Sequence, residues 1–130
     1  MGYGFGMRCP KCGFSYNMFL DGGMRDCREE DLLTGRVKKD RRFQEWRPIF
    51  KAIPDAECVR NMVVYQCPKC LAIDNVRETV LIGKQNGRYK ILARSQHYCK
   101  ACGSKMKVTE NLKCPHCRTD MEKVSTINWD

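Results

Sequence analysis

Residues 99–117 read Cys-Lys-Ala-Cys-Gly-Ser-Lys-Met-Lys-Val-Thr-Glu-Asn-Leu-Lys-Cys-Pro-His-Cys, a stretch that begins and ends with a Cys-x-x-Cys pair. Two residues between cysteines allow a tight turn to direct both sulfurs at one ion about 2.3 Å away, and two facing turns complete a tetrahedron of thiolates. Two further pairs, Cys9/Cys12 and Cys67/Cys70, occur earlier in the chain. The 130 residues therefore predict two four-cysteine centres, each suited to a structural zinc ion.

The spacing of the pairs suggests how they combine. Only eleven residues separate Cys102 from Cys114, which is the length of a β-hairpin, so the last two pairs are predicted to share an ion. The predicted sites are then Cys9, Cys12, Cys67, Cys70 for the first, and Cys99, Cys102, Cys114, Cys117 for the second. The long loop inside the first site costs only about 0.6 kcal/mol per doubling of its length. The competing arrangement, which joins the 67/70 pair to the 99/102 pair, stays open.

The composition also favours metal over a large apolar core. Hydrophobic residues make up 42% of the chain, but that share includes ten cysteines. A small domain that is short of core residues is usually stabilised by disulfides or by a metal. The N-terminal sequence does not resemble a signal peptide, and no apolar run is long enough to span a membrane. We therefore expect a cytoplasmic protein with reduced thiols and no membrane partner.

The remaining sequence predicts a small metal-stabilised α+β fold. Alternating apolar residues predict strands over 14–18, 76–82 and 88–94, and Asn86-Gly87 predicts a tight hairpin turn with both residues at positive φ. Polar residues 24–61 predict a helical insertion, with a helix that stops or kinks near Trp46 because Pro48 follows. Further helical turns are expected around 26–33 and from Pro54, and further strands at 62–66, 104–108 and 121–126.

Two of the cysteine pairs, Cys-Pro-Lys-Cys-Gly at 9–13 and Cys-Lys-Ala-Cys-Gly at 99–103, resemble the knuckles of zinc ribbons, also called rubredoxin-like knuckles. The arrangement resembles small bacterial zinc-ribbon proteins that carry no assigned activity. The resemblance implies two ribbons, each a short antiparallel sheet with its knuckles: residues 1–96 as an interrupted ribbon that contains the insertion, and residues 97–130 as a C-terminal ribbon. Leu71 and Arg118 stand where such knuckles usually have glycine, which predicts looser turns there.

The same cysteines suit other kinds of site. Iron in a rubredoxin-like electron carrier takes the same ligands. A thioredoxin-like pair needs a helix start after a strand, which none of the four pairs provides. A catalytic zinc needs an open coordination position, whereas four cysteines close the shell, and His97 and His116 are expected at the surface. With no phosphate loop or catalytic triad, we expect a non-enzymatic protein without a small-molecule substrate.

Two basic segments suggest a partner. Residues 36–51 carry seven basic residues against two acidic ones, and residues 79–109 carry no acidic residue. Strand alternation predicts that Arg88, Lys90 and Arg94 share one face while Tyr89 points to the core. The predicted nucleic-acid contacts are Lys84, Arg88, Lys90 and Arg94. Two zinc–thiolate centres would lower the formal charge of +9 by four, which weakens the argument from net charge alone.

The alternative partner is another protein. Phe43, Trp46 and Phe50 fall on one side of a helix and could form the contact surface of an adaptor, or simply pack on the fold. Cys27 and Cys58 belong to no motif and are expected to be small buried apolar residues or incidental thiols.

Overall fold

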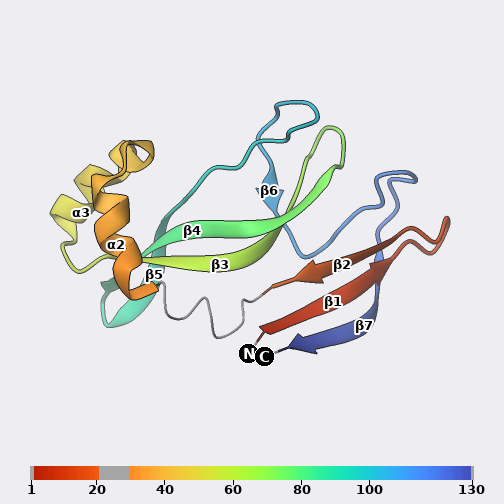
Figure 1. Ribbon diagram of the computed structural model, residues 1–130, viewed down its shortest axis with the longest axis horizontal. Helices are drawn as coiled ribbons and strands as arrows, with labels where there is room; N and C mark the ends of the chain where they lie inside the picture. Colours follow the sequence, from red (N-terminus) through yellow and green to blue (C-terminus); the bar gives the residue numbers. More distant parts are fainter. Residues whose placement is uncertain (1, 21–29, 130) are drawn as a thin grey trace.

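A computed structural model describes residues 2–20 and 30–129, and of residues 30–33 and 129 only the backbone. The fold is mostly β and contains two antiparallel sheets (Figure 1). Sheet A has the order β2-β1-β7 and is built from β1 (Gly2–Arg8), β2 (Ser15–Phe19) and β7 (Glu122–Trp129). Both ends of the chain thus lie in adjacent strands, with Gly2 opposite Trp129.

Sheet B has the order β5-β4-β3-β6. Its strands are β3 (Glu57–Gln66), β4 (Ile73–Gln85), β5 (Arg88–Arg94) and the two-residue β6 (Lys107–Val108). The long β3–β4 hairpin pairs over ten residues, from Glu57 opposite Ile82 to Gln66 opposite Ile73. The β4–β5 turn has Asn86 at φ 53° and Gly87 at φ 78°, so the predicted tight turn is confirmed.

The helical segments α2 (Glu30–Lys39), η1 (Arg41–Trp46, a 3-10 helix) and α3 (Arg47–Ala52) lie between β2 and β3. Asp40 caps η1 because its side chain accepts a hydrogen bond from the backbone N–H of Arg42. The chain changes helix type after Trp46, and Pro48 stands in the first turn of α3, where its missing N–H costs nothing. The predicted stop near Trp46 is therefore confirmed.

These helices cover one end of sheet B through a small apolar core. Trp46 is 2% exposed and Leu81 is fully buried, and both lie in a cluster with Val37, Ala56 and Cys58. In Figure 1 the helices stand at the left end of the β3–β4 ladder, far from the loops that carry the cysteine pairs. The helices and the 67–70 cysteine pair thus lie at opposite ends of the β3–β4 ladder.

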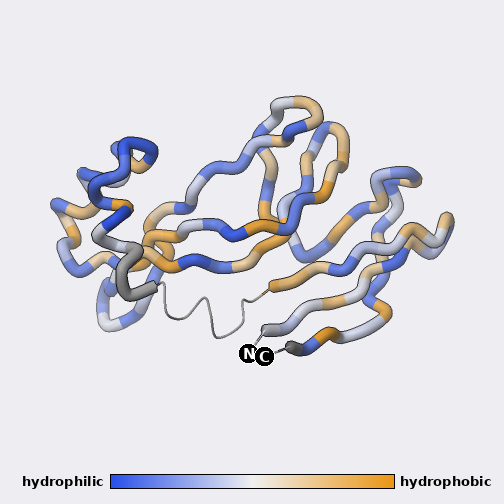
Figure 2. Tube along the Cα trace, in the orientation of Figure 1, coloured by the Kyte–Doolittle hydropathy of each residue, from blue (hydrophilic) through white to orange (hydrophobic). Residues whose placement is uncertain are grey.

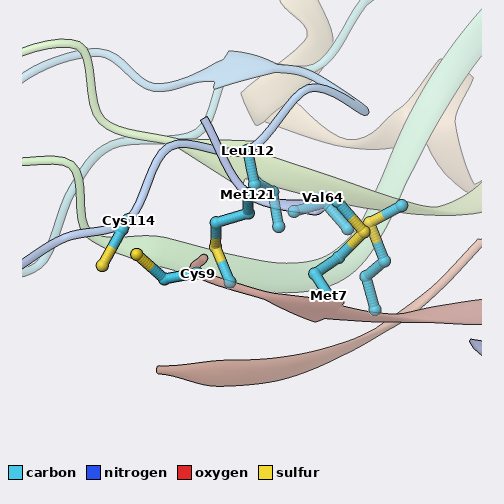
Figure 3. Packing of buried hydrophobic residues seen from close by; sticks show 7 residues of the cluster. Met7, Cys9, Val64, Leu112, Cys114 and Met121 are labelled. Carbon is cyan, nitrogen blue, oxygen red and sulfur yellow. The ribbon is translucent and has the colours of Figure 1, made fainter. Parts of the chain in front are cut away.

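Two side-chain amides tie sheet B to other parts of the chain. Asn75 Nδ2 donates to Phe19 O over 2.8 Å, while Phe19 N donates to Asn75 Oδ1 over 2.6 Å, which links β4 to β2. Gln66 makes the same kind of reciprocal pair with Lys113. Gln66 Nε2 donates to Lys113 O over 2.7 Å, and Lys113 N donates to Gln66 Oε1 over 2.9 Å. A second core, which contains Met7, Met18, Val64, Leu112 and Met121, fills the space between the sheets (Figure 3).

Several predicted elements differ from the structure. Strand β1 was absent from the predicted elements because Gly2, Gly4 and Gly6 lower its strand propensity. No helix starts at Pro54; that residue lies in the turn before β3. The predicted turns around 26–33 and the first residues of the 24–61 insertion, Cys27 included, lie partly outside the described residues.

The predicted boundary between residues 96 and 97 is also corrected. Strand β7 belongs to sheet A with β1 and β2, while β6 belongs to sheet B with β3. Residues 97–130 therefore contribute to both sheets. They also enter two cores, because Met106 packs in a third core with Tyr65, Cys67 and Cys99, while Leu112 packs in the core between the sheets. Sheet A combines the first two strands with the last one, and sheet B combines residues 57–94 with β6.

Candidate metal centres

The eight paired cysteines gather into two groups within the described residues. Centre A consists of Cys9, Cys12, Cys114 and Cys117, and centre B consists of Cys67, Cys70, Cys99 and Cys102. In each group the four Sγ atoms lie within 4.8 Å of one another. Within each centre, sulfur atoms from the two knuckles lie 3.4–3.5 Å apart, as for Cys67 and Cys102 or Cys12 and Cys114. These distances are too long for a disulfide bond, whose length is about 2.05 Å. Four convergent thiols at this spacing suit one tetrahedral ion.

All four knuckles have one local structure. In each, the residue before the first cysteine pairs with the residue seven positions later: Arg8 with Ser15, Gln66 with Ile73, Tyr98 with Lys105 and Lys113 with Asp120. In each, the N–H four residues after the first cysteine donates to that cysteine's carbonyl over 2.8–3.0 Å. The first cysteine of each pair is buried and the second is more exposed. The first thiol thus anchors the knuckle in a core, as Figure 3 shows for Cys9 and Cys114.

The closing residue of each knuckle has a left-handed backbone. Its φ is 76° at Gly13 and 77° at Gly103, and it is 62° at Leu71 and 61° at Arg118. The looser turns predicted at Leu71 and Arg118 are therefore wrong: the hydrogen bonds of the knuckle hold these residues in the same conformation as glycine. A side chain in that region costs of the order of 1 kcal/mol.

The predicted pairing of the knuckles is corrected by this arrangement. Cys9 and Cys12 meet Cys114 and Cys117, and the competing arrangement of 67/70 with 99/102 is the one observed. The physical reason is that 99–102 and 114–117 are not the two ends of one hairpin. Each is the tip of its own eight-residue hairpin, and the short link between them carries Met106 into one core and Leu112 into another.

The surroundings shift the pKa values of the thiols apart. A hydrogen bond from the Ser104 hydroxyl is the main reason that the pKa of Cys102 falls to about 6. The backbone N–H of Cys12 is the main reason that the pKa of Cys9 falls to about 7. The Cys12 thiol, by contrast, is the main cause that raises the pKa of Cys117 to about 12. Cys9 in centre A and Cys102 in centre B, whose pKa values are lowered, therefore ionise more readily than a free cysteine, whereas the raised pKa of Cys117 means that this thiol ionises when a divalent ion binds.

The predicted basic contacts do not form one row. A bulge between Leu81 and Ile82 on β4 leaves Leu92 of β5 without an opposite residue, so the alternation along β5 changes there. Arg94 then lies on the face of Tyr89 and Ile91, where it bonds the buried carboxylate of Glu78. Arg88 and Lys90 lie on the other face, and Lys84 is paired with Tyr89. The prediction that Tyr89 points to the core is wrong, since its side chain is 67% exposed.

The two basic segments nevertheless meet at one end of the molecule. Leu92 and Ala93 of β5 pack on the same core as Val37 and Trp46 from the helices. Segment 36–51 therefore lies beside the β4–β5 hairpin, and Figure 2 shows hydrophilic residues concentrated on the helices at this end. We call this region the basic end; it comprises residues 36–51 and 83–94.

The aromatic residues, the histidines and Cys58, which the sequence raised as candidates, contribute to packing and hydrogen bonding. Trp46 is buried, and Phe43 and Phe50 pack against it, so these residues form core rather than the exposed contact surface expected of an adaptor. His97 Nε2 lies 2.6 Å from Asp74 Oδ2, and the His116 ring stands edge-on to Phe14; neither histidine belongs to a cysteine group. Cys58 is 2% exposed, and burial raises its pKa to about 11.

Comparison of this chain with protein-family models, with curated proteins and with solved structures finds no match. No helix among the described residues is long and apolar enough to cross a membrane. The cysteine groups and the surfaces around them are therefore the observations from which a function can be argued.

Proposed function

We propose that this chain is a non-enzymatic protein with two structural zinc ions, and that its basic end binds nucleic acid. Zinc is the ion we name because four thiolates close the tetrahedral shell of a structural zinc site, with one cysteine of every knuckle buried in a core. Iron takes the same four ligands, so metal analysis decides between the two ions. Each ion would then join two hairpins from distant parts of the chain and form a ribbon. Metal analysis of protein from its native host tests this part: colourless protein with two zinc ions per chain supports it, and bound iron contradicts it.

The observation that carries the nucleic-acid proposal is the convergence of the two basic segments. Segment 36–51 has seven basic residues against Asp40 and Glu45, and the hairpin has no acidic residue. The tip of the hairpin adds Tyr89, 67% exposed, directly across the ladder from Lys84. Cations attract a phosphate backbone, and an exposed ring offers a surface on which a base can stack.

A salt titration with matched variants tests the proposal. The hairpin variant combines Lys84→Ala, Arg88→Ala and Lys90→Ala, and the control combines Lys11→Ala, Lys69→Ala and Lys100→Ala at the knuckles, with the same loss of charge. If three phosphate contacts are lost, the slope of log affinity against log salt falls by about two for a single strand. The control should keep the wild-type slope. Equal effects of the two variants, or an affinity that does not respond to salt, would count against the proposal.

A further inference from the structure

A cleft of about 600 Å³ lies between the helices and sheet B. Four arginines from four elements line it: Arg36 from α2, Arg42 from η1, Arg60 from β3 and Arg77 from β4. Among the residues that the structure describes, the acidic ones in its lining are Asp40 and Glu45, and Asp40 is ion-paired to Arg42 over 2.7 Å. A guanidinium has five N–H donors, so it can bond a carboxylate and still offer donors to a phosphate.

The rim of the cleft carries a fixed aromatic ring. Tyr98 is 54% exposed, yet its hydroxyl donates a 2.6 Å hydrogen bond to Gln96 Oε1, and its backbone pairs with Lys105. Its neighbour His97 is held by Asp74 and stacks on Tyr65 at 4.7 Å between ring centroids. An exposed ring that is held in place loses little freedom when a flat ligand stacks on it.

We propose that this cleft takes up one nucleoside phosphate unit, with its phosphate among the arginines and its base on Tyr98. The volume suits such a unit, since ligand sites usually span about 300–1,000 Å³. The unit can come from a free nucleotide or from a single strand, whereas the bases of a duplex are stacked and closed to the ring. The single-strand source rests on the proposed function and makes it more specific.

The test compares a nucleoside monophosphate, a labelled single strand of about twelve nucleotides and the matching duplex. Tyr98→Ala should weaken single-strand binding by about 5- to 100-fold and leave duplex binding unchanged, whereas Tyr98→Phe should retain it. Tyr3→Ala, at an exposed tyrosine of sheet A, is the control. All variants must keep their metal content.

The outcomes separate this inference from the proposed function. If Tyr98→Ala and Arg36→Ala bind the strand and the monophosphate as the wild type does, the cleft is not the site. The salt slope of the hairpin variant would then still decide the proposed function. Monophosphate binding that Tyr98→Ala abolishes, without strand binding, assigns the cleft to a free nucleotide.

A second inference rests on a different residue, Gln66, which lies directly before the ligand Cys67. Its side chain is buried and makes three hydrogen bonds. Nε2 donates to Leu71 O over 3.0 Å, at the closing residue of the same knuckle. The reciprocal pair with Lys113 holds the residue directly before Cys114 of the other centre. One amide thus fixes a knuckle of centre B and the start of a knuckle of centre A.

We infer that Gln66 couples the metal affinities of the two centres. Binding of an ion at centre B orders the 67–70 knuckle and, through this amide, Lys113 beside Cys114, so the second ion meets a more ordered site. Such a coupling acts equally in both directions and typically changes affinity by about 5- to 150-fold. Gln66 acts here through other residues and contacts no ligand sulfur in this role, so it is a positioning residue.

A thermodynamic cycle tests the coupling. The zinc affinity of centre B is measured by chelator competition in the otherwise unmodified chain and in Cys9→Ser/Cys12→Ser, which removes centre A. We expect the intact chain to bind at least about fivefold more tightly, and Gln66→Ala to bring this ratio to about one. Asn75→Ala is the matched control, because Asn75 also makes a reciprocal amide pair from sheet B, but it contacts Phe19 and Val63 rather than a knuckle. It should lower stability and preserve the ratio.

Gln66→Glu adds a conservative variant, because a carboxylate cannot donate to the carbonyls of Leu71 and Lys113. It should lose the coupling as the alanine variant does. A ratio of one in the wild type, or a ratio that Gln66→Ala leaves unchanged, would overturn the inference. A ratio that falls equally in Gln66→Ala and Asn75→Ala would assign the effect to general stability and would overturn it too.

Discussion

At the scale of single residues, the knuckles show how local geometry overrides sequence preference. Leu71 and Arg118 adopt the φ that glycine adopts in the other two knuckles, because the hydrogen bond to the first cysteine's carbonyl requires it. The sequence predicted the four turns from the cysteines alone. It could not predict that all four turns have the same geometry. Glycine closes two of the knuckles and a larger residue closes the other two, which suggests two kinds of turn, but the backbone is the same in all four.

The strained closing residues can be tested by a reciprocal exchange. Arg118 is exposed, so Arg118→Gly removes a left-handed side chain and little else; we expect the free energy of unfolding to rise by about 1 kcal/mol. Gly103→Ala should lower it by a similar amount, because a Cβ there meets no atom within 4 Å and only the backbone is strained. Denaturant unfolding of the zinc-loaded proteins measures both, and equal stabilities would refute the strain.

Cys58 makes the stability depend on alkaline pH. Burial raises its pKa from 9.0 to about 11, so the folded state keeps the proton that the unfolded state loses. Stability therefore falls as pH rises from about 9 towards 11, and Cys58→Ala should show a smaller fall over that window. The measurement compares the slope of unfolding free energy against pH in the wild type and in Cys58→Ala. Slopes are used because the variant also loses the packing of the buried thiol, which lowers its unfolding free energy at every pH. Tyr65, whose pKa burial raises from 10.0 to about 12, adds a fall between about pH 10 and 12 in both proteins, so it cancels when their slopes are compared.

At the scale of elements, β1 holds sheet A together although its sequence is a poor strand former. Its glycines are required by close approach: a Cβ at Gly4 would overlap the backbone carbonyl of Met18 on β2, and one at Gly6 would overlap the Ser125 hydroxyl on β7. Alternation of glycine with larger residues places Phe5 and Met7 towards the core. These contacts come from strands distant in sequence, so no local pattern could have predicted the element.

Gly4→Ala should therefore destabilise the protein by about 1–3 kcal/mol, because a backbone atom must move to make room. Gly35→Ala in α2 is the control, since its Cβ would meet nothing within 4 Å and alanine favours a helix by up to about 1 kcal/mol. Thermal unfolding of the two variants should shift in opposite directions. A Gly4→Ala protein as stable as the wild type would show that β2 can separate from β1 without cost.

At the scale of the whole molecule, the four turns that present the cysteines were predictable and their connectivity was not. The four pairs follow from the spacing of the cysteines, since a tight turn needs only its own residues. Which knuckles meet depends on the pairing of β7 with β1 and of β6 with β3. These strand pairings depend on two different cores, because Met106 is buried in one and Leu112 in the other. Which core buries a residue depends on the whole fold and cannot be predicted from the local sequence.

Double cysteine variants test the connectivity directly. Cys9→Ser with Cys114→Ser removes two ligands of centre A and should leave one zinc ion per chain. Cys9→Ser with Cys67→Ser removes one ligand from each centre and should leave none bound with native affinity. Metal content after gel filtration in a weak chelator measures both. The pairing suggested by sequence spacing requires the opposite result, so the experiment discriminates between the two.

The pairing of Gly2 with Trp129 has a consequence for how a cell makes this protein. Along the chain 102 residues separate Cys12 from its partner Cys114, and β7 comes later still. Cys99 and Cys102 precede Cys114, so centre B can close during synthesis while the thiols of Cys9 and Cys12 still wait for theirs. The nascent chain is therefore exposed to oxidation at Cys9 and Cys12 until β7 has been made and can pair with β1.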